Sequence, residues 1–265
     1  MAFERELEVA KEAARKAGEV MGHYRENGFE VDRKDSYTDL VTEADHEAQE
    51  VIVETIQEEF PEDGFLAEEN DLRPGGEDRV WVIDPVDGTT NFVHGFPYYG
   101  TSIALRTGGV SKVGAVYLPS LDEMFSAVED GGATVNGKEI RVSDVEELRD
   151  SLLFIPLHDS SREELGKGLE LVDDAIRNPA SYRRPGAAAP DLCMVASGRA
   201  DGIAMSSINP WDIAAGELII REAGGSVRVQ DSITDGYLET VASNGKIQEQ
   251  LEEVFDRNVR DQDRS

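Results

Sequence analysis

Two aspartates three residues apart, Asp84 and Asp87, follow a short apolar run in the segment WVIDPVDGTTNF. The run, residues 80–83, predicts a buried strand, so the Asp84 carboxylate would be partly desolvated where that strand reaches the surface. Pro85 prevents a regular ladder strand from continuing, and the turn that it starts can bring Asp87 beside Asp84. Converging carboxylates repel each other, and a divalent cation removes that repulsion. Ligands that are all oxygen favour Mg²⁺, although a strand followed by a capped turn would also explain this pattern by itself.

The residues after Asp87 have the types that a phosphate group needs. Gly88, Thr89, Thr90 and Asn91 predict a glycine turn that opens a helix. Backbone N–H groups in such a turn can hold an anion, and the Thr89 hydroxyl adds a donor. The alternative is ordinary capping of the helix by Thr or Asn. Both roles are compatible, because a phosphate site is a helix N-terminus with open space above it.

Three more acidic positions are distant from this segment in the sequence. Glu68 and Glu69 follow the apolar run 65–67, and neighbouring residues of a strand point to opposite faces. Only one of the two would therefore point at a metal, with the other behind it. Asp212 starts a helix in NPWDIAAGELIIREAGG, where the bulky Trp211 would hold it in place. The alternatives are a solvated loop pair for the glutamates and a helix cap for the aspartate.

A fourth acidic stretch, DLVTEAD, ends at Asp45. Thr42 and Asp45 have the spacing of a helix start, and Lys34 lies in the polar segment before them. From the residues alone, this stretch is a helix cap and a solvated loop.

The first half of the chain must place most of these groups. Apolar residues at three- and four-residue steps predict a helix over residues 3–25 and a second helix after Thr42. Several strand-like runs separated by turn residues follow them: 65–67, 80–83, 101–106, 112–117 and 124–128. Two helices followed by successive strands predict an α+β half with an antiparallel sheet.

From about Ser151 strands and helices alternate, which predicts a mixed α/β half. Helices are expected over 162–177, 190–197, 211–223 and 248–255, with strands between them, and residues 257–265 are expected to be a frayed tail. The acidic region 143–150 is the expected boundary. We therefore predict two halves, residues 1–148 with most metal ligands and residues 149–265 with Asp212 and the substrate contacts.

The composition of the 265 residues excludes several classes of protein. No apolar run approaches the ~20 residues of a membrane span, and the charged, helical N-terminus is not a secretory signal. The single cysteine, Cys193, excludes an internal disulfide, so we expect a cytoplasmic location. Neither Cys193 nor any of the four histidines has the spacing of a ligand set. A net charge of −29 argues against nucleic acid or an anionic membrane as partner.

The acidic surface also has an unusual balance of bases, with 7 lysines against 19 arginines. This balance resembles that of proteins from salt-accumulating halophiles. At ~1 M salt the Debye length is about 3 Å, which suppresses the repulsion within such a surface. We expect a halophilic source, with an ordinary acidic protein as the alternative.

Together these stretches resemble the inositol monophosphatase family, a group of metal-dependent phosphomonoesterases. The family includes archaeal fructose-1,6-bisphosphatases and, more distantly, phosphoadenosine phosphate phosphatases. The matching motifs are DLVTEAD, AEEN, WVIDPVDGTTNFVHGFP, GAVYLPSLDEMFSAVEDGGATVNGKEIRVS and NPWDIAAGELIIREAGG, in the family's order. The resemblance implies a layered αβαβα sandwich, Mg²⁺ dependence, inhibition by Li⁺ and a homodimer.

The resemblance also implies roles for residues at matched positions. One Mg²⁺ would be held by Glu68, Asp84 and the Val86 carbonyl, and a second by Asp84, Asp87 and Asp212, with a third, weaker ion near Glu68. Thr89, hydrogen-bonded to Asp45, would orient and help to deprotonate the attacking water. The amides of Gly88 and Thr89 would hold phosphate oxygens. Glu69, Lys34 and Trp211 would support these groups from behind.

Two departures from the family pattern concern the substrate. Met205 stands where family members often carry a Glu that binds a polyol hydroxyl, which puts inositol in doubt. Arg183 and Arg184 match the family's Arg-x-x-Gly segment, which ends here at Gly186, and paired arginines suit a second phosphate. The alternative is that these arginines are a surface pair that balances the charge of nearby acidic residues. Ala67, in place of the usual glycine before the glutamates, is a small change.

The expected function is therefore Mg²⁺-dependent hydrolysis of a small sugar- or polyol-phosphate monoester, inositol 1-phosphate or fructose 1,6-bisphosphate. The alternatives are a phosphatase for nucleotides such as 3′-phosphoadenosine 5′-phosphate, and a non-catalytic scaffold that binds metal and phosphorylated ligands.

Overall fold

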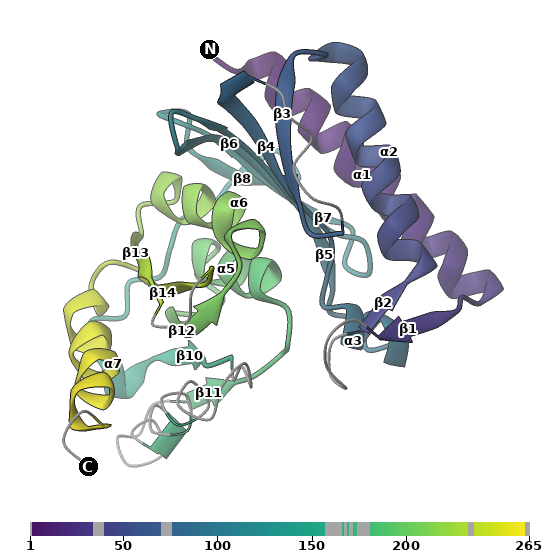
Figure 1. The fold of residues 1–265 in the computed structure, drawn as a ribbon. Coiled ribbons are helices and arrows are strands. Elements are labelled where there is room, and N and C mark those ends of the chain that lie inside the picture. Colours follow the sequence, from purple (N-terminus) through teal and green to yellow (C-terminus); the bar gives the residue numbers. More distant parts are fainter. Residues whose placement is uncertain are drawn as a thin grey trace.

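The structure is a computed structural model of the chain and describes residues 2–33, 40–69, 76–156, 181–232 and 236–262, together with residues 166, 169, 172 and 173. Its elements stack in five layers, helix–sheet–helix–sheet–helix (Figure 1). This is the αβαβα sandwich that the family resemblance implies. None of the described helices is long and apolar enough to cross a membrane.

The first two layers come from the N-terminal half. Helices α1 (Glu4–Asn27) and α2 (Glu43–Glu59) cover one face of a seven-stranded sheet (Figure 1). In spatial order its strands are β3 (Asp63–Ala67), β4 (Gly76–Asp87), β5 (Gly100–Thr107), β6 (Val110–Leu118), β7 (Glu123–Val128), β8 (Ala133–Val135) and β9 (Lys138–Glu139). Only the β3–β4 pair is parallel. A small hairpin, β1 (Val31–Arg33) and β2 (Leu40–Thr42), and the short helix α3 (Thr89–His94) lie near one end of this sheet.

The other three layers come from the C-terminal half. Helices α5 (Ala188–Ala196) and α6 (Pro210–Glu222) lie between the two sheets, and α7 (Gln248–Gln262) covers the outer face of the second (Figure 1). The second sheet has the order β11 (Ser181–Arg183), β10 (Leu152–Phe154), β12 (Gly202–Ile208), β14 (Leu238–Ser243) and β13 (Ser226–Asp231). It mixes parallel and antiparallel pairs, and a short 3₁₀ turn, Leu148–Asp150, precedes it.

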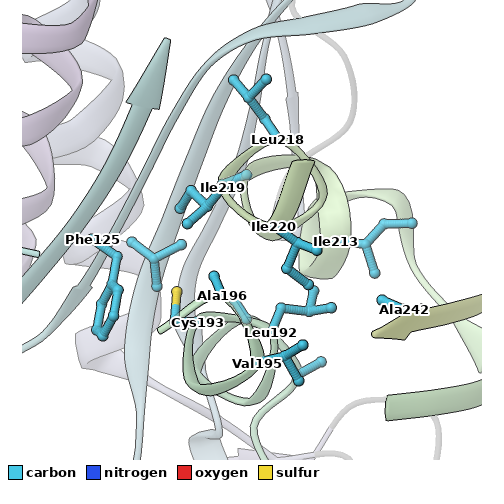
Figure 2. Packing of buried hydrophobic residues seen from close by; sticks show 14 of the residues in the cluster. Phe125, Leu192, Cys193, Val195, Ala196, Ile213, Leu218, Ile219, Ile220 and Ala242 are labelled. Carbon is cyan, nitrogen blue, oxygen red and sulfur yellow. The ribbon is translucent and has the colours of Figure 1, made fainter. Parts of the chain in front are cut away.

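Period-two alternation along the strands builds a separate core on each face of the sheets. On β4, Trp81 and Ile83 are fully buried against α1 and α2, whereas Val82 is buried against the middle helices. Figure 2 shows the middle core, where residues of α5 and α6 lie between Phe125 of β7 and Ala242 of β14. Because this core joins both sheets, it fixes the C-terminal helices against the strands that carry the acidic residues.

Two element boundaries differ from the sequence-based expectation. Strand β4 does not end at Pro85 but continues to Asp87, because a bulge accommodates the proline. The expected frayed tail is instead helical as far as Gln262, as the continuation of α7, which is anchored by the buried Leu251 and Phe255. Most of the helix expected over 162–177 lies outside the described residues, and the division at residues 148/149 stays a prediction.

Candidate active site

A bulge in β4 places Asp84 and Asp87 on the same side of the sheet. Asp84 pairs with Ser102 and Asp87 with Gly100, so three steps along β4 match two along β5. In a regular strand, residues three apart face opposite sides, and one extra residue reverses this. The bulge lies at Pro85–Val86, where proline has no N–H to leave unpaired. The spacing of the two aspartates therefore follows from the irregularity between them.

Helix α6 brings Asp212 to the same end of the sheet. Asp212 closes a capping box in which its carboxylate accepts a hydrogen bond from the backbone N–H of Asn209 at 3.0 Å. The hydroxyl of Ser102 on β5 donates to the Trp211 carbonyl at 3.2 Å, which ties the start of α6 to the neighbour of Asp84. The Trp211 indole packs against the middle core, as the sequence suggests for a residue that supports Asp212.

The two glutamates after β3 have separate environments. The N–H of Glu68 donates to the carbonyl of Ile83, the residue before Asp84, at 3.2 Å. The Glu68 charge adds to burial in raising the pKa of Asp84 and Asp212. The N–H of Glu69 instead donates to the Gln49 side chain at 2.9 Å, on helix α2. The Glu68 carboxylate is thus close enough to Asp84 and Asp212 to affect the pKa of both.

Burial and crowding favour the protonated forms of these aspartates. Burial, followed by the charges of Glu68, Asp87 and Asp212, raises the pKa of Asp84 well above its usual value. Burial and Glu68 raise the pKa of Asp212 to about 7. Asp84 and Asp212 also lie close enough for their carboxyl groups to affect each other's pKa. Without a cation, burial and the repulsion among carboxylates this close raise both pKa values.

The donor set fits an oxygen-preferring divalent cation such as Mg²⁺ by its chemistry. Asp84 is only 1% exposed, so its negative charge is costly unless a cation compensates it. In the described part of the chain, however, no three His, Cys, Asp or Glu side chains are placed so that they could hold one ion together. A bound ion therefore requires these carboxylates to lie closer together than they do here.

Asp45 and Thr89 form a hydrogen-bonded pair between α2 and α3. One Asp45 oxygen accepts from the N–H and hydroxyl of Thr42, at 2.8 and 2.5 Å, and completes a capping box. The other accepts from the Thr89 hydroxyl at 3.1 Å. That hydroxyl also lies 3.0 Å from the Val86 carbonyl, but it has one proton and satisfies one acceptor at a time. Either way its lone pairs stay available to accept a hydrogen bond from water.

Asp87 lies at the N-terminus of α5, a helix without a side-chain cap of its own. Its carboxylate accepts a short hydrogen bond, 2.5 Å, from the N–H of Ala189 and a further one from Ala188. These bonds oppose the rise in the pKa of Asp87 that burial and the Asp212 charge cause. The C-terminal half thus holds a carboxylate that belongs to the first sheet.

The turn at Gly88 requires glycine. Its φ is +92°, and a Cβ there would lie 3.0 Å from the Ala187 side chain and 3.2 Å from the Tyr98 carbonyl. The segment before α5 therefore lies directly against the turn that the sequence predicts to bind phosphate.

The two predicted arginines are exposed, and their segment reaches the same turn. Arg183 ends β11, and its guanidinium donates to the Tyr182 carbonyl at 2.8 Å. Beyond the exposed Arg184, the Pro185 carbonyl accepts from the Asn91 side chain at 2.9 Å. Gly186, with φ +91°, lies beside the same amide. Pro185 and Gly186 therefore lie against Asn91, three residues after Gly88 in the sequence, and the two arginines directly precede them.

The remaining predicted residues are Met205 and Lys34. Met205 is fully buried in the middle core, so its side chain is not available to a substrate. Lys34 lies outside the described residues.

Sequence reasoning missed the buried pair Tyr98–Asp191 and assigned no specific role to Asn91. The Tyr98 hydroxyl donates to Asp191 at 2.7 Å, and burial raises the pKa of Asp191 to about 8. The available signal was that Asp191 is the one charged residue in the apolar stretch 187–196. For Asn91 the signal was its place directly after the glycine turn, in the segment DGTTN.

Comparison with known proteins relates nearly the whole chain to one protein family. The sequence model of the inositol monophosphatase family matches residues 3–257. The putative Nus factor SuhB of Neisseria meningitidis serogroup B (strain MC58) is 38% identical over 261 residues, which cover 96% of this chain and 98% of the relative. The Nus factor SuhB of Pasteurella multocida is 40% identical over 224 residues, which cover 83% and 84%.

Solved structures show the same fold. The IMPase of Thermotoga maritima superposes with a TM-score of 0.85 at 35% identity, covering 97% of this chain and 99% of its own. The inositol monophosphatase of Anabaena (Nostoc) superposes with a TM-score of 0.84 at 33% identity, covering 97% of both chains.

Proposed function

The chain belongs to the inositol monophosphatase family, and from this premise we propose that it hydrolyses sugar- or polyol-phosphate monoesters with Mg²⁺. The observation that carries the proposal is the set of four carboxylates, Glu68, Asp84, Asp87 and Asp212, from three distant segments. Burial, and after it the charges of neighbouring members of this set, raises the pKa values of the three aspartates. Such crowding at one end of a sheet is typical of a functional site.

The proposed ligands are Glu68, Asp84 and the Val86 carbonyl for one ion, and Asp84, Asp87 and Asp212 for a second. Bound there, Mg²⁺ would lower the pKa of a water molecule and stabilise the leaving oxygen. A third ion near Glu68 is part of the same proposal.

The protein's own groups orient the reactants. Asp45 accepts a hydrogen bond from the Thr89 hydroxyl. A lone pair of the Thr89 oxygen can then accept a hydrogen bond from the attacking water, and Thr89 helps to remove the water's proton as its own proton passes to Asp45. The N–H groups of Gly88 and Thr89 would hold phosphate oxygens at the start of α3. The start of α5 keeps Asp87 in one orientation through the N–H of Ala189.

The substrate we favour carries two phosphates, as fructose 1,6-bisphosphate does. Two observations support this choice. Met205 is buried and cannot contact a polyol hydroxyl. The exposed Arg183 and Arg184 directly precede Pro185, whose carbonyl accepts a hydrogen bond from Asn91 beside the proposed phosphate-binding turn. Arginine suits a phosphate because its planar group can make two parallel hydrogen bonds.

The names of the relatives raise a second candidate, a binding role without catalysis, because several are called Nus factor SuhB. The intact Asp45–Thr89 pair favours catalysis here, since a scaffold has no need of a group that activates water. A nucleotide such as 3′-phosphoadenosine 5′-phosphate stays an alternative substrate. Inhibition by Li⁺ and a homodimer stay predictions.

Phosphate release separates these candidates. The panel is inositol 1-phosphate, fructose 1,6-bisphosphate and 3′-phosphoadenosine 5′-phosphate, each assayed in high salt with Mg²⁺ or with EDTA. We expect Mg²⁺-dependent release, greatest from the bisphosphate. Asp84→Asn and Asp212→Asn should each lower kcat by about 10³-fold or more while the protein stays folded, because each removes a ligand charge worth several kcal/mol. No release from any ester by the wild type, or near wild-type rates in both variants, would refute the proposal.

A further inference from the structure

Asn91 joins three segments of the chain through one side-chain amide. Its NH₂ group donates to the carbonyl of Tyr98 at 2.7 Å and to that of Pro185 at 2.9 Å, and it lies 3.4 Å from the carbonyl of Gly186. Two hydrogens serve three acceptors, so both are fully used. Tyr98 follows α3, whereas Pro185 and Gly186 belong to the C-terminal half, 94 residues away from Asn91 for Pro185.

The segment that Asn91 holds lies between two regular elements. Strand β11 ends at Arg183 and helix α5 begins at Ala188. Residues 184–187 therefore belong to neither, and Gly186 within them has a left-handed φ of +91°. Ala187 at the end of the segment lies against the Gly88 turn. The position of Arg184 relative to that turn thus depends on how the connecting backbone is held.

We propose that Asn91 is a positioning residue that sets the distance between Arg184 and the phosphate-binding turn, and that it thereby determines selectivity for bisphosphates. This inference rests on the proposed function, because Arg184 can select a substrate only if the site binds phosphate esters. The Asn91 amide contacts the backbone carbonyls of Tyr98, Pro185 and Gly186, and we place it outside the groups that contact the reacting phosphate. Its effect should therefore fall on the binding of the second phosphate rather than on bond cleavage.

The test is a double-mutant cycle with Asn91→Ala and Arg184→Ala, measuring kcat and KM for fructose 1,6-bisphosphate and for inositol 1-phosphate. We expect Asn91→Ala to raise KM for the bisphosphate about tenfold, the size expected when a pair of hydrogen bonds is lost. The kcat and the KM for the monophosphate should change by less than about threefold. The double variant should be no worse than Arg184→Ala alone, since both changes remove one interaction.

A matched control distinguishes positioning from general stability. Asn244 also donates through its side-chain amide to two acceptors, Ser143 at 2.9 Å and the Val145 carbonyl at 2.8 Å, at the end of β14. Asn244→Ala should lower Tm and leave the KM ratio of the two substrates unchanged. If Asn91→Ala does not fold, Gly186→Ala perturbs the same segment from its other side, because alanine is strained at φ +91°. It should produce the same change in the KM ratio.

Hydrogen exchange supplies a second readout that needs no catalysis. The backbone amides of residues 184, 186 and 187 should exchange faster in Asn91→Ala, with those of β5 unchanged; Pro185 has no N–H. The inference is overturned if the exchange of these amides is unchanged, or if the effects of the two substitutions on KM multiply in the double variant. Phosphate release by the wild type would still support the proposed function in that case. A wild type that releases no phosphate would overturn both.

Discussion

At the scale of single residues, Asp45 has two roles. Asp45 is fully buried, and burial raises its pKa, whereas the hydrogen bonds from Thr42 lower it. The same carboxylate caps α2 with one oxygen and receives the Thr89 hydroxyl with the other. Asp45 therefore serves both stability and the proposed chemistry, and two substitutions can separate these roles.

Asp45→Asn should lower kcat by about 10²-fold or more, because an amide is a poor acceptor for a proton passed on by Thr89. Thr42→Ala removes the hydroxyl that caps α2 and should cost about 1 kcal/mol of stability. Its kcat should stay at least about tenfold above that of Asp45→Asn. Steady-state kinetics and thermal unfolding of both variants check this. Equal kcat values in the two variants would show that Asp45 has only a structural role.

At the scale of elements, close packing sets where α6 holds Asp212. A Cβ on Gly114 of β6 would lie 2.8 Å from the Ala215 carbonyl and 3.2 Å from its Cα, both backbone atoms that cannot rotate away. The Ser111 hydroxyl also donates to the Ala214 carbonyl at 2.9 Å. The start of α6 is thus fixed to the first sheet at backbone contact.

Gly114→Ala should push α6 from the sheet, cost about 1–3 kcal/mol, and raise the Mg²⁺ concentration needed for half-maximal activity because Asp212 moves with the helix. Gly22→Ala is the control: it lies on the exposed side of α1 with nothing near its Cβ and should stabilise by about 0.5–1 kcal/mol. Thermal melts and Mg²⁺ titrations of both variants are the measurements. An unchanged Mg²⁺ requirement in Gly114→Ala would contradict the role of this packing.

Most elements could be predicted from the sequence, because hydrophobic periodicity reflects which face of each strand or helix is buried. The alternation at Trp81, Val82 and Ile83 is an example. The bulge was missed because proline usually ends a strand, and only the partner strand shows that β4 resumes. The bonds of Asn91 to Pro185 and of Tyr98 to Asp191 join residues 94 and 93 apart, and spacing along the chain carries no information on such contacts.

At the scale of the whole molecule, the acidic groups make stability depend on pH and on cations. Burial raises the pKa of Asp212 to about 7 and that of Asp191 to about 8. A carboxyl whose pKa rises on folding binds its proton more tightly in the folded state. Its contribution to stability is therefore full below the unfolded pKa of about 4 and is lost as pH rises toward the folded pKa. Repulsion within the overall charge of −29 also lowers stability as pH rises. A halophilic source stays a prediction.

In EDTA, Tm should therefore fall as pH rises from about 5 to about 8. Added Mg²⁺ should reduce that fall, because a cation bound only by the folded protein stabilises it. Thermal melts at fixed high salt measure both effects. Asp191→Asn should flatten the part of the curve that Mg²⁺ does not restore. A Tm in EDTA that stays level or rises over this range would contradict the burial of these carboxyls.

The central claim is that carboxylates from three distant segments share divalent cations at the end of the first sheet. Its most direct test is a crystal structure with Mn²⁺ in place of Mg²⁺, located by anomalous scattering. The account predicts two ions, both within bonding distance of Asp84, one also bound by Glu68 and the other by Asp87 and Asp212. Anomalous density only elsewhere, with no ion between Asp84 and Asp212, would contradict it.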